Sequence, residues 1–180
     1  MNDNNYALLG VIAPLTAYIF VGTAVTLSPW FSWQENALSD LGHAINSNVA
    51  AIFNFGLLLT GFLIGIYSVT AFRKYAKYSS VFLLISAFSL QLVATFNETY
   101  CFVHFAVSMV FFILIGTTLI VYSIEKRSFV SITAFIIGIG SWILYWANPY
   151  SAGIAVPEAI SSLSAASWVI FSAFKIYLTK

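Results

Sequence analysis

Six stretches of this chain are apolar over the length that a helix needs to cross a lipid bilayer. The hydrocarbon core takes about 20 residues of α-helix, because each residue advances the helix by about 1.5 Å. Only 7% of the residues are charged, whereas soluble domains carry about 25%, so most of the surface is not built to face water. The pattern predicts an all-α, polytopic integral membrane protein, a single domain over residues 1–180 with six transmembrane helices in one bundle, near residues 6–27, 49–72, 80–96, 102–122, 129–147 and 158–178.

The basic residues predict how this bundle is oriented. All seven lie in two connections on the same side of the predicted bundle or near the end of the chain: Arg73, Lys74, Lys77, Lys126, Arg127, Lys175 and Lys180. Short loops rich in Lys and Arg stay in the cytoplasm, so both termini are predicted to be cytoplasmic. We therefore expect a multi-pass protein of the cell membrane.

The opposite, outward side holds both histidines and four of the six acids. An ionisable side chain that faces lipid at the bilayer centre costs about 2.5–3.5 kcal/mol, so such groups turn toward the bundle interior. Polar residues also recur one helical turn apart, which places them on shared faces. Together they predict an outward-facing polar pocket lined by His43, Asn54, Gln91, Glu98 and Ser108.

Two kinds of chemistry fit these residue types. Asp40, His43 and His104 are candidate ligands of a divalent metal such as zinc, with a position left open for water in metal-assisted hydrolysis. Ser39, near Asp40 and His104, is a candidate activated nucleophile. Neither His-Glu-x-x-His nor Gly-x-Ser-x-Gly occurs. Membrane hydrolases of the ceramidase and adiponectin-receptor type use three histidines, and this chain has two.

A resemblance to a known family rests on three short elements. The segment Asn36-Ala-Leu-Ser-Asp-Leu-Gly42 follows the first apolar stretch, Asn97-Glu98 precedes His104, and Gly153 to Glu158 opens the last stretch. These elements resemble an uncharacterised family of prokaryotic multi-helix membrane proteins, although Ala159 stands where that family often has a basic residue. The resemblance implies the six-helix fold and supplies no activity. It points to four candidate catalytic residues: Ser39, Asp40, His104 and Glu158.

The sequence leaves several functions open, including whether the protein is an enzyme. The first is an outward pocket that binds a cation or the headgroup of a membrane lipid, with or without metal-assisted hydrolysis. The second is an accessory or structural subunit of a homo-oligomer or membrane complex, packing through Gly61-x-x-x-Gly65 and a serine-rich face of the last helix. A small-solute transporter is third, and a haem held by the two histidines is the remaining option. A net charge of +1 implies no attraction to nucleic acid.

Overall fold

The computed structural model describes residues 3–147 and 152–179, and within these ranges it contains helices and no strand. Among the described residues, six helices are long and apolar enough to cross a membrane, which confirms the all-α polytopic fold. Lys180 lies outside the described residues. The elements are α1 (Asp3–Ala7), α2 (Leu9–Thr26), η1 (Leu38–Gly42), α3 (Ala50–Tyr67), η2 (Ser68–Phe72), α4 (Arg73–Tyr75), α5 (Lys77–Thr95), η3 (Glu98–Tyr100), α6 (Phe102–Lys126), α7 (Phe129–Ala147) and α8 (Ala155–Leu178).

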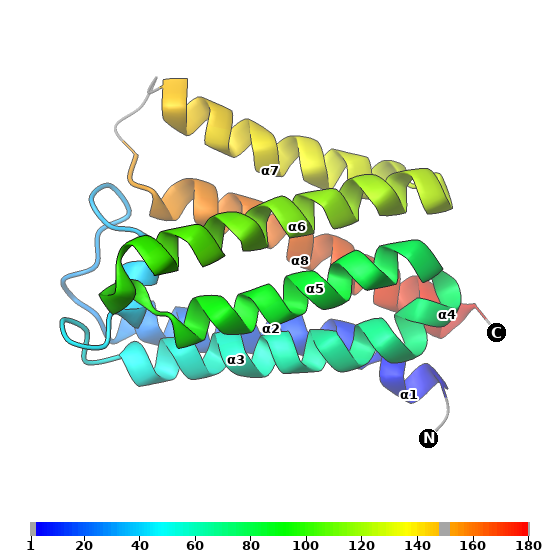
Figure 1. Cartoon of the computed structure of the whole chain (residues 1–180), viewed down its shortest axis with the longest axis horizontal. Coiled ribbons are helices and arrows are strands. Elements are labelled where there is room, and N and C mark those ends of the chain that lie inside the picture. The colour runs from blue at the N-terminus through cyan, green and yellow to red at the C-terminus, as the bar shows by residue number, and fades with distance from the viewer. Residues whose placement is uncertain (1–2, 148–151, 180) are drawn as a thin grey trace.

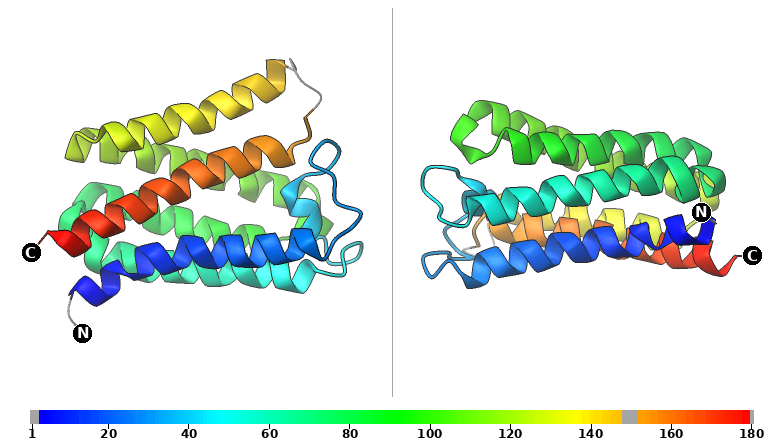
Figure 2. Two further views of the ribbon diagram at one scale, coloured as in Figure 1. Left: turned by 180° about the vertical axis from the view of Figure 1, so that it is seen from behind. Right: turned by 90° about the horizontal axis from the view of Figure 1, so that it is seen from below.

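The long helices form a ring. Each packs against the next along the chain, in the order α2, α3, α5, α6, α7 and α8, and α8 packs against α2 to close the ring. Figures 1 and 2 show both chain termini at one end of the bundle, which we call the terminal end. The connections α2–α3 and α5–α6 gather at the other end, the loop end, together with the end of α7 and the start of α8 (Figure 1). Every described Lys and Arg belongs to a segment at the terminal end.

Helices extend beyond their predicted ends where basic residues begin. The second span continues through the π-helical turn Ser68–Phe72 to Tyr75, the third begins at Lys77, and the fourth ends at Lys126. The backbone breaks at Ala76, whose φ is −137°. Hydropathy measures the part of a helix that lies in hydrocarbon, whereas Lys and Arg continue the helix and extend their charged ends to the polar interface.

The terminal end is filled by four large aromatic side chains, Tyr67, Phe72, Tyr122 and Trp168, which we call the aromatic cluster. All four are at most 1% exposed. The Phe72 and Tyr122 rings stack with centroids 5.7 Å apart, and Trp168 meets Tyr122 edge-on at 5.0 Å. The Tyr67 hydroxyl shares a 2.9 Å hydrogen bond with Ser172 on α8. This cluster joins α3, α6 and α8.

The two faces of small residues that suggested a partner pack inside the chain. A Cβ on Gly61 would lie 2.7 Å from the Ala87 carbonyl oxygen, so α3 and α5 approach closely there. A Cβ on Gly138 of α7 would lie 3.6 Å from atoms of Ser161 and Ser164 on α8. Small residues thus serve helix–helix contacts within the ring. Association with a partner remains a prediction.

Candidate functional site

The loop between α2 and α3 is anchored to two helices through η1. The Leu38 N–H donates to Glu158 Oε2 on α8 at 2.7 Å. At the other end of η1, Asn54 Nδ2 on α3 donates to the Gly42 carbonyl at 2.8 Å. Because a buried backbone polar group needs a partner, each helix side chain stabilises the position of the loop above it.

The chain at the start of α8 packs directly on the same loop. The N–H of Gly153 donates to the Trp33 carbonyl at 3.0 Å, and the N–H of Ala155 donates to the Asn36 carbonyl, also at 3.0 Å. A Cβ on Gly153 would lie 2.8 Å from the Trp33 carbonyl oxygen. The two backbones meet so closely that only glycine fits at this point.

Asp40 and His43 stabilise the loop itself. Asp40 Oδ2 accepts hydrogen bonds from the Ala37 N–H at 3.0 Å and from Asn36 Nδ2 at 2.9 Å, as a carboxylate does at the start of a helical turn. The His43 Nδ1 atom accepts from the Asn46 N–H at 3.2 Å. Both side chains therefore find their partners within the α2–α3 loop.

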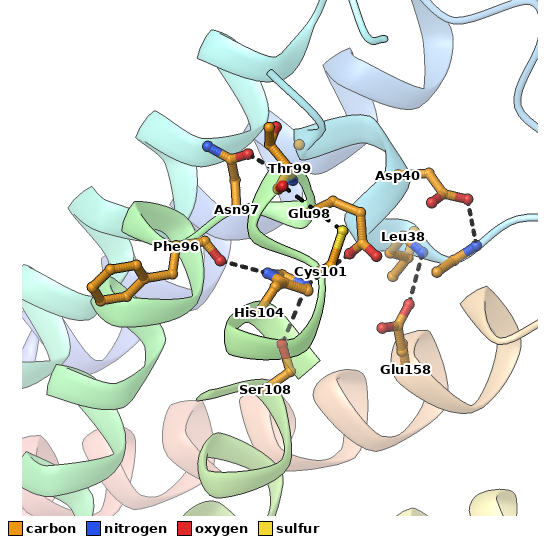
Figure 3. Close-up of polar contacts among 12 residues, drawn as sticks. Leu38, Asp40, Phe96, Asn97, Glu98, Thr99, Cys101, His104, Ser108 and Glu158 are labelled. Carbon is orange, nitrogen blue, oxygen red and sulfur yellow. Dashed lines mark hydrogen bonds and ion pairs between the residues drawn. The ribbon is translucent and has the colours of Figure 1, made fainter. Parts of the chain in front are cut away.

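A tight turn between α5 and α6 brings an acid and an imidazole together. The backbone reverses at Cys101, whose φ is 44°, and Glu98 Oε2 then lies 3.0 Å from His104 Nε2 (Figure 3). The His104 Nδ1 atom lies 2.8 Å from the Phe96 carbonyl, which can only accept, so Nδ1 carries a hydrogen. The Ser108 hydroxyl lies 3.3 Å from Nε2 on the helical turn below.

These contacts give the imidazole two sets of partners. When His104 is protonated, its Nε2–H donates a hydrogen bond to Glu98. When His104 is neutral, Nε2 accepts a hydrogen bond from the Ser108 hydroxyl. The His104 imidazole lowers the pKa of the Glu98 carboxyl against the opposing effect of burial, and Ser39 and His43 add smaller contributions in the same direction. Glu98 Oε2 is buried and has no other partner among the described residues. The site can thus hold a proton between Glu98 and His104.

Five side chains, which we call the polar cluster, gather at the loop end from three parts of the chain: Ser39, Glu98, His104, Ser108 and Glu158. All five line a cavity of about 660 Å³ between α6, α7 and α8, the lateral cavity. Three of the five, Ser39, Ser108 and Glu158, also line a cavity of about 460 Å³ that is lined by residues of α2, α3, α5, α6 and α8, the central cavity. Figure 3 shows the Glu98 and Glu158 carboxylates pointing toward the same space.

The remaining predicted pocket residues lie elsewhere. Asn54 supports η1, as described above. Gln91 lies against α3, where a Cβ on Gly61 would meet its Cγ at 2.7 Å, and it lines neither cavity. Gln91 and Glu98 were predicted to line one pocket, but the turn after Thr95 carries Glu98 toward α6 while Gln91 faces α3.

The three predicted metal ligands do not form one donor set. Asp40 and His43 have their partners within the α2–α3 loop, and His104 pairs with Glu98. Among the described residues, no group of three His, Cys, Asp or Glu side chains is placed to hold a metal ion.

Two features of the site were not predicted from the sequence. One is the backbone of Leu38 and Gly153, whose N–H groups fasten the loop to α8 and to Trp33. The other is the aromatic wall of α7, where Trp142, Tyr145 and Trp146 line the lateral cavity. The sequence shows the spacing of these three aromatic residues, but aromatic side chains near the end of a transmembrane helix are equally expected at any membrane interface.

The six spans and their arrangement define a multi-pass α-helical membrane protein. The chain belongs to the family described as Protein of unknown function (DUF998), whose model matches residues 11–175. This confirms the resemblance to an uncharacterised family. No curated protein and no solved structure matches the chain.

Proposed function

We propose that this protein binds a membrane amphiphile, with the headgroup in the polar cluster and hydrocarbon in the lateral cavity. The observation that carries the proposal is the composition of that cavity: its loop end is formed by the polar cluster, and its walls below are mostly apolar. Its volume of about 660 Å³ falls within the range of about 300–1,000 Å³ that ligand sites occupy. A cavity with one polar end and apolar walls complements the polar headgroup and the hydrocarbon chain of a lipid.

The charges favour a headgroup that carries an ammonium. The polar cluster offers the carboxyl oxygens of Glu98 and Glu158 as hydrogen-bond acceptors, while every described Lys and Arg lies in a segment at the terminal end. Ammonium groups donate to carboxylates in charge-assisted hydrogen bonds. The rings of Trp142, Tyr145 and Trp146 on the same cavity add faces that attract cations. An anionic headgroup would face the Glu98 carboxylate, and the only cationic partner that the polar cluster offers it is a protonated His104, which is already paired with Glu98.

Two lipids with the same chains and the same phosphate test this headgroup preference. Dioleoylphosphatidylethanolamine carries an ammonium, and dioleoylphosphatidylglycerol carries neutral hydroxyls in its place. We expect the purified protein in detergent, titrated with each lipid and followed by native mass spectrometry, to bind the first at least tenfold more tightly.

A matched pair of variants places the binding in the polar cluster. Glu98→Gln removes the charge beside His104 and is expected to weaken binding of dioleoylphosphatidylethanolamine by about tenfold, about 1.4 kcal/mol. Glu35→Gln removes an exposed acid of the α2–α3 loop and is expected to leave the affinity unchanged. Equal affinities for the two lipids, together with no effect of Glu98→Gln, would overturn the proposal.

A further inference from the structure

We infer that the bound amphiphile has two hydrocarbon chains, one in the central cavity and one in the lateral cavity. The inference rests on the proposed function and names the lipid class that this site takes. It begins from the residues that the two cavities share. Those residues are Ser39, Ser108, Phe112, Ile115, Glu158 and Ala165.

The shared residues have a clear order along the helices. Ser39, Ser108 and Glu158 lie at the loop end and belong to the polar cluster. Below them, Phe112 and Ile115 on α6 and Ala165 on α8 line both cavities. The cavities thus meet under one polar cluster and then lie on opposite sides of the boundary between α6 and α8. One headgroup at the loop end therefore has apolar space on both sides of this boundary.

Both cavities have the depth of a hydrocarbon chain in one leaflet. The central cavity is lined along α8 from Glu158 to Val169, about 16 Å of helix. The lateral cavity is lined along α6 from His104 to Ile120, about 24 Å of helix. Half of the bilayer hydrocarbon core is about 15 Å thick. Each cavity can therefore take a chain whose headgroup stays at the loop end.

Neither cavity includes the aromatic cluster of the terminal end. None of the four residues of the aromatic cluster lines either cavity. The two volumes, about 460 and 660 Å³, each fall within the range of a ligand site. A single-chain amphiphile would fill one cavity and leave the walls of the other without packed atoms, which forfeits their dispersion contacts. Two hydrocarbon chains would supply packed atoms to the walls of both cavities.

The experiment compares lipids that differ only in chain number. Dioleoylphosphatidylethanolamine and its single-chain form, 1-oleoyl-lysophosphatidylethanolamine, have the same headgroup. We expect the full-length protein, titrated in detergent and followed by native mass spectrometry, to bind the two-chain lipid at least tenfold more tightly. Equal affinities in the unaltered protein, with Glu98→Gln still weakening both, would overturn the inference and leave the proposed function standing.

Variants in which a larger side chain fills one of the two cavities provide a second test of the two-chain inference. Ala166 lines only the central cavity, and Thr117 lines only the lateral cavity. Ala166→Phe and Thr117→Phe are each expected to weaken binding of the two-chain lipid by about tenfold. Each should change binding of the single-chain lipid by less than threefold, because one cavity remains open to its chain.

Folding of these variants is checked by their melting temperature. If Ala166→Phe does not fold, Ala17→Leu narrows the central cavity from the α2 wall with a smaller side chain. Loss of the two-chain preference only in the lateral variant would show that the central cavity takes no chain, and this result would also overturn the inference.

Discussion

The two ends of this bundle are stabilised in different ways. At the terminal end, the aromatic cluster fills the space between α3, α6 and α8, and its rings contact one another at centroid distances of 5.0 to 5.9 Å. Glu125 of α6 adds an acceptor for the N–H of Ser79 at 2.8 Å, which caps the first turn of α5. At the loop end, isolated hydrogen bonds secure a backbone loop above two cavities. Asn54 donates to the Gly42 carbonyl, Glu158 accepts from the Leu38 N–H, and the N–H groups of Gly153 and Ala155 donate to carbonyls of the loop.

This difference separates stability from binding. Close packing of large rings contributes to the stability of the whole molecule, because every removed atom leaves a void in a filled core. Hydrogen bonds to a loop above a cavity control local opening, which costs less free energy than global unfolding. We therefore expect changes at the terminal end to lower the free energy of unfolding most, and changes at the loop end to lower it less while altering local exchange and ligand binding.

The largest effect is expected for Trp168→Ala. Trp168 is fully buried between Phe72 and Tyr122, and removing it should cost about 3–5 kcal/mol of unfolding free energy. Trp146→Ala is the control, because Trp146 is 78% exposed, and it should cost less than about 1 kcal/mol. Unfolding in mixed micelles with increasing denaturing detergent measures both. Equal losses would mean that the terminal end is not the stability core.

The second effect compares two glycines. Gly153→Ala places a Cβ 2.8 Å from backbone atoms of Trp33 and Gln34, so the two backbones must separate at a cost of about 1–3 kcal/mol. Gly140→Ala, in the middle of α7, meets no atom within 4 Å and should gain about 0.5–1 kcal/mol. Hydrogen exchange should show faster exchange over residues 33–38 in the first variant only. Unchanged exchange there would contradict the close packing at Gly153.

The spans of this protein are predictable from sequence because a helix in lipid satisfies all its backbone hydrogen bonds within itself, so the length of apolar sequence is enough. The helix ends are not, since Lys77 and Lys126 continue the helix although hydropathy has already fallen. The contact between Glu98 and His104 can also be predicted from the sequence, because the two residues flank a short turn between two predicted spans.

The rest of the site depends on contacts that side-chain patterns do not encode. Glu158 has as its partner the N–H of Leu38, 120 residues earlier, and no residue type marks a backbone donor. Asp40 was predicted to be a catalytic residue and a metal ligand, but its spacing after Asn36 and Ala37 is also that of a carboxylate that caps its own loop. Only the folded structure of the loop shows whether the Asp40 carboxylate faces the site or caps the loop.

A smaller effect is expected for the hydrogen bond between Glu158 and Leu38. Glu158→Leu removes the acceptor, and the Leu38 amide should exchange about fivefold faster, the equivalent of about 1 kcal/mol of local opening. Glu158→Gln keeps a carbonyl acceptor of the same length and should exchange nearly as the unaltered protein does. Exchange of backbone amides around the aromatic cluster should not change in either variant. Faster exchange at both ends would show that the loop end is not an independent unit.

The smallest effect concerns the pH dependence of the loop end. The neighbouring His104 imidazole lowers the pKa of Glu98, so the carboxylate stabilises the folded state at pH values above the ordinary carboxyl pKa. This contribution is lost as the pH falls through the lowered pKa of the folded state, because protonated Glu98 no longer attracts the imidazolium. The Glu98 side chain is 30% exposed, and solvent screening limits the contribution to less than about 1 kcal/mol.

Melting temperatures between pH 7 and about pH 3 separate this contribution from those of other carboxyl groups. The unaltered protein should lose stability on acidification more than Glu98→Gln does, and the two curves should converge at the acid end. Trp168→Ala gives the opposite pattern, a curve lowered by a similar amount at every pH, because no proton is involved in the packing of its ring. A Glu98→Gln curve parallel to that of the unaltered protein would mean that the pair with His104 adds no stability, and the contrast between a packed end and a titratable end would fail.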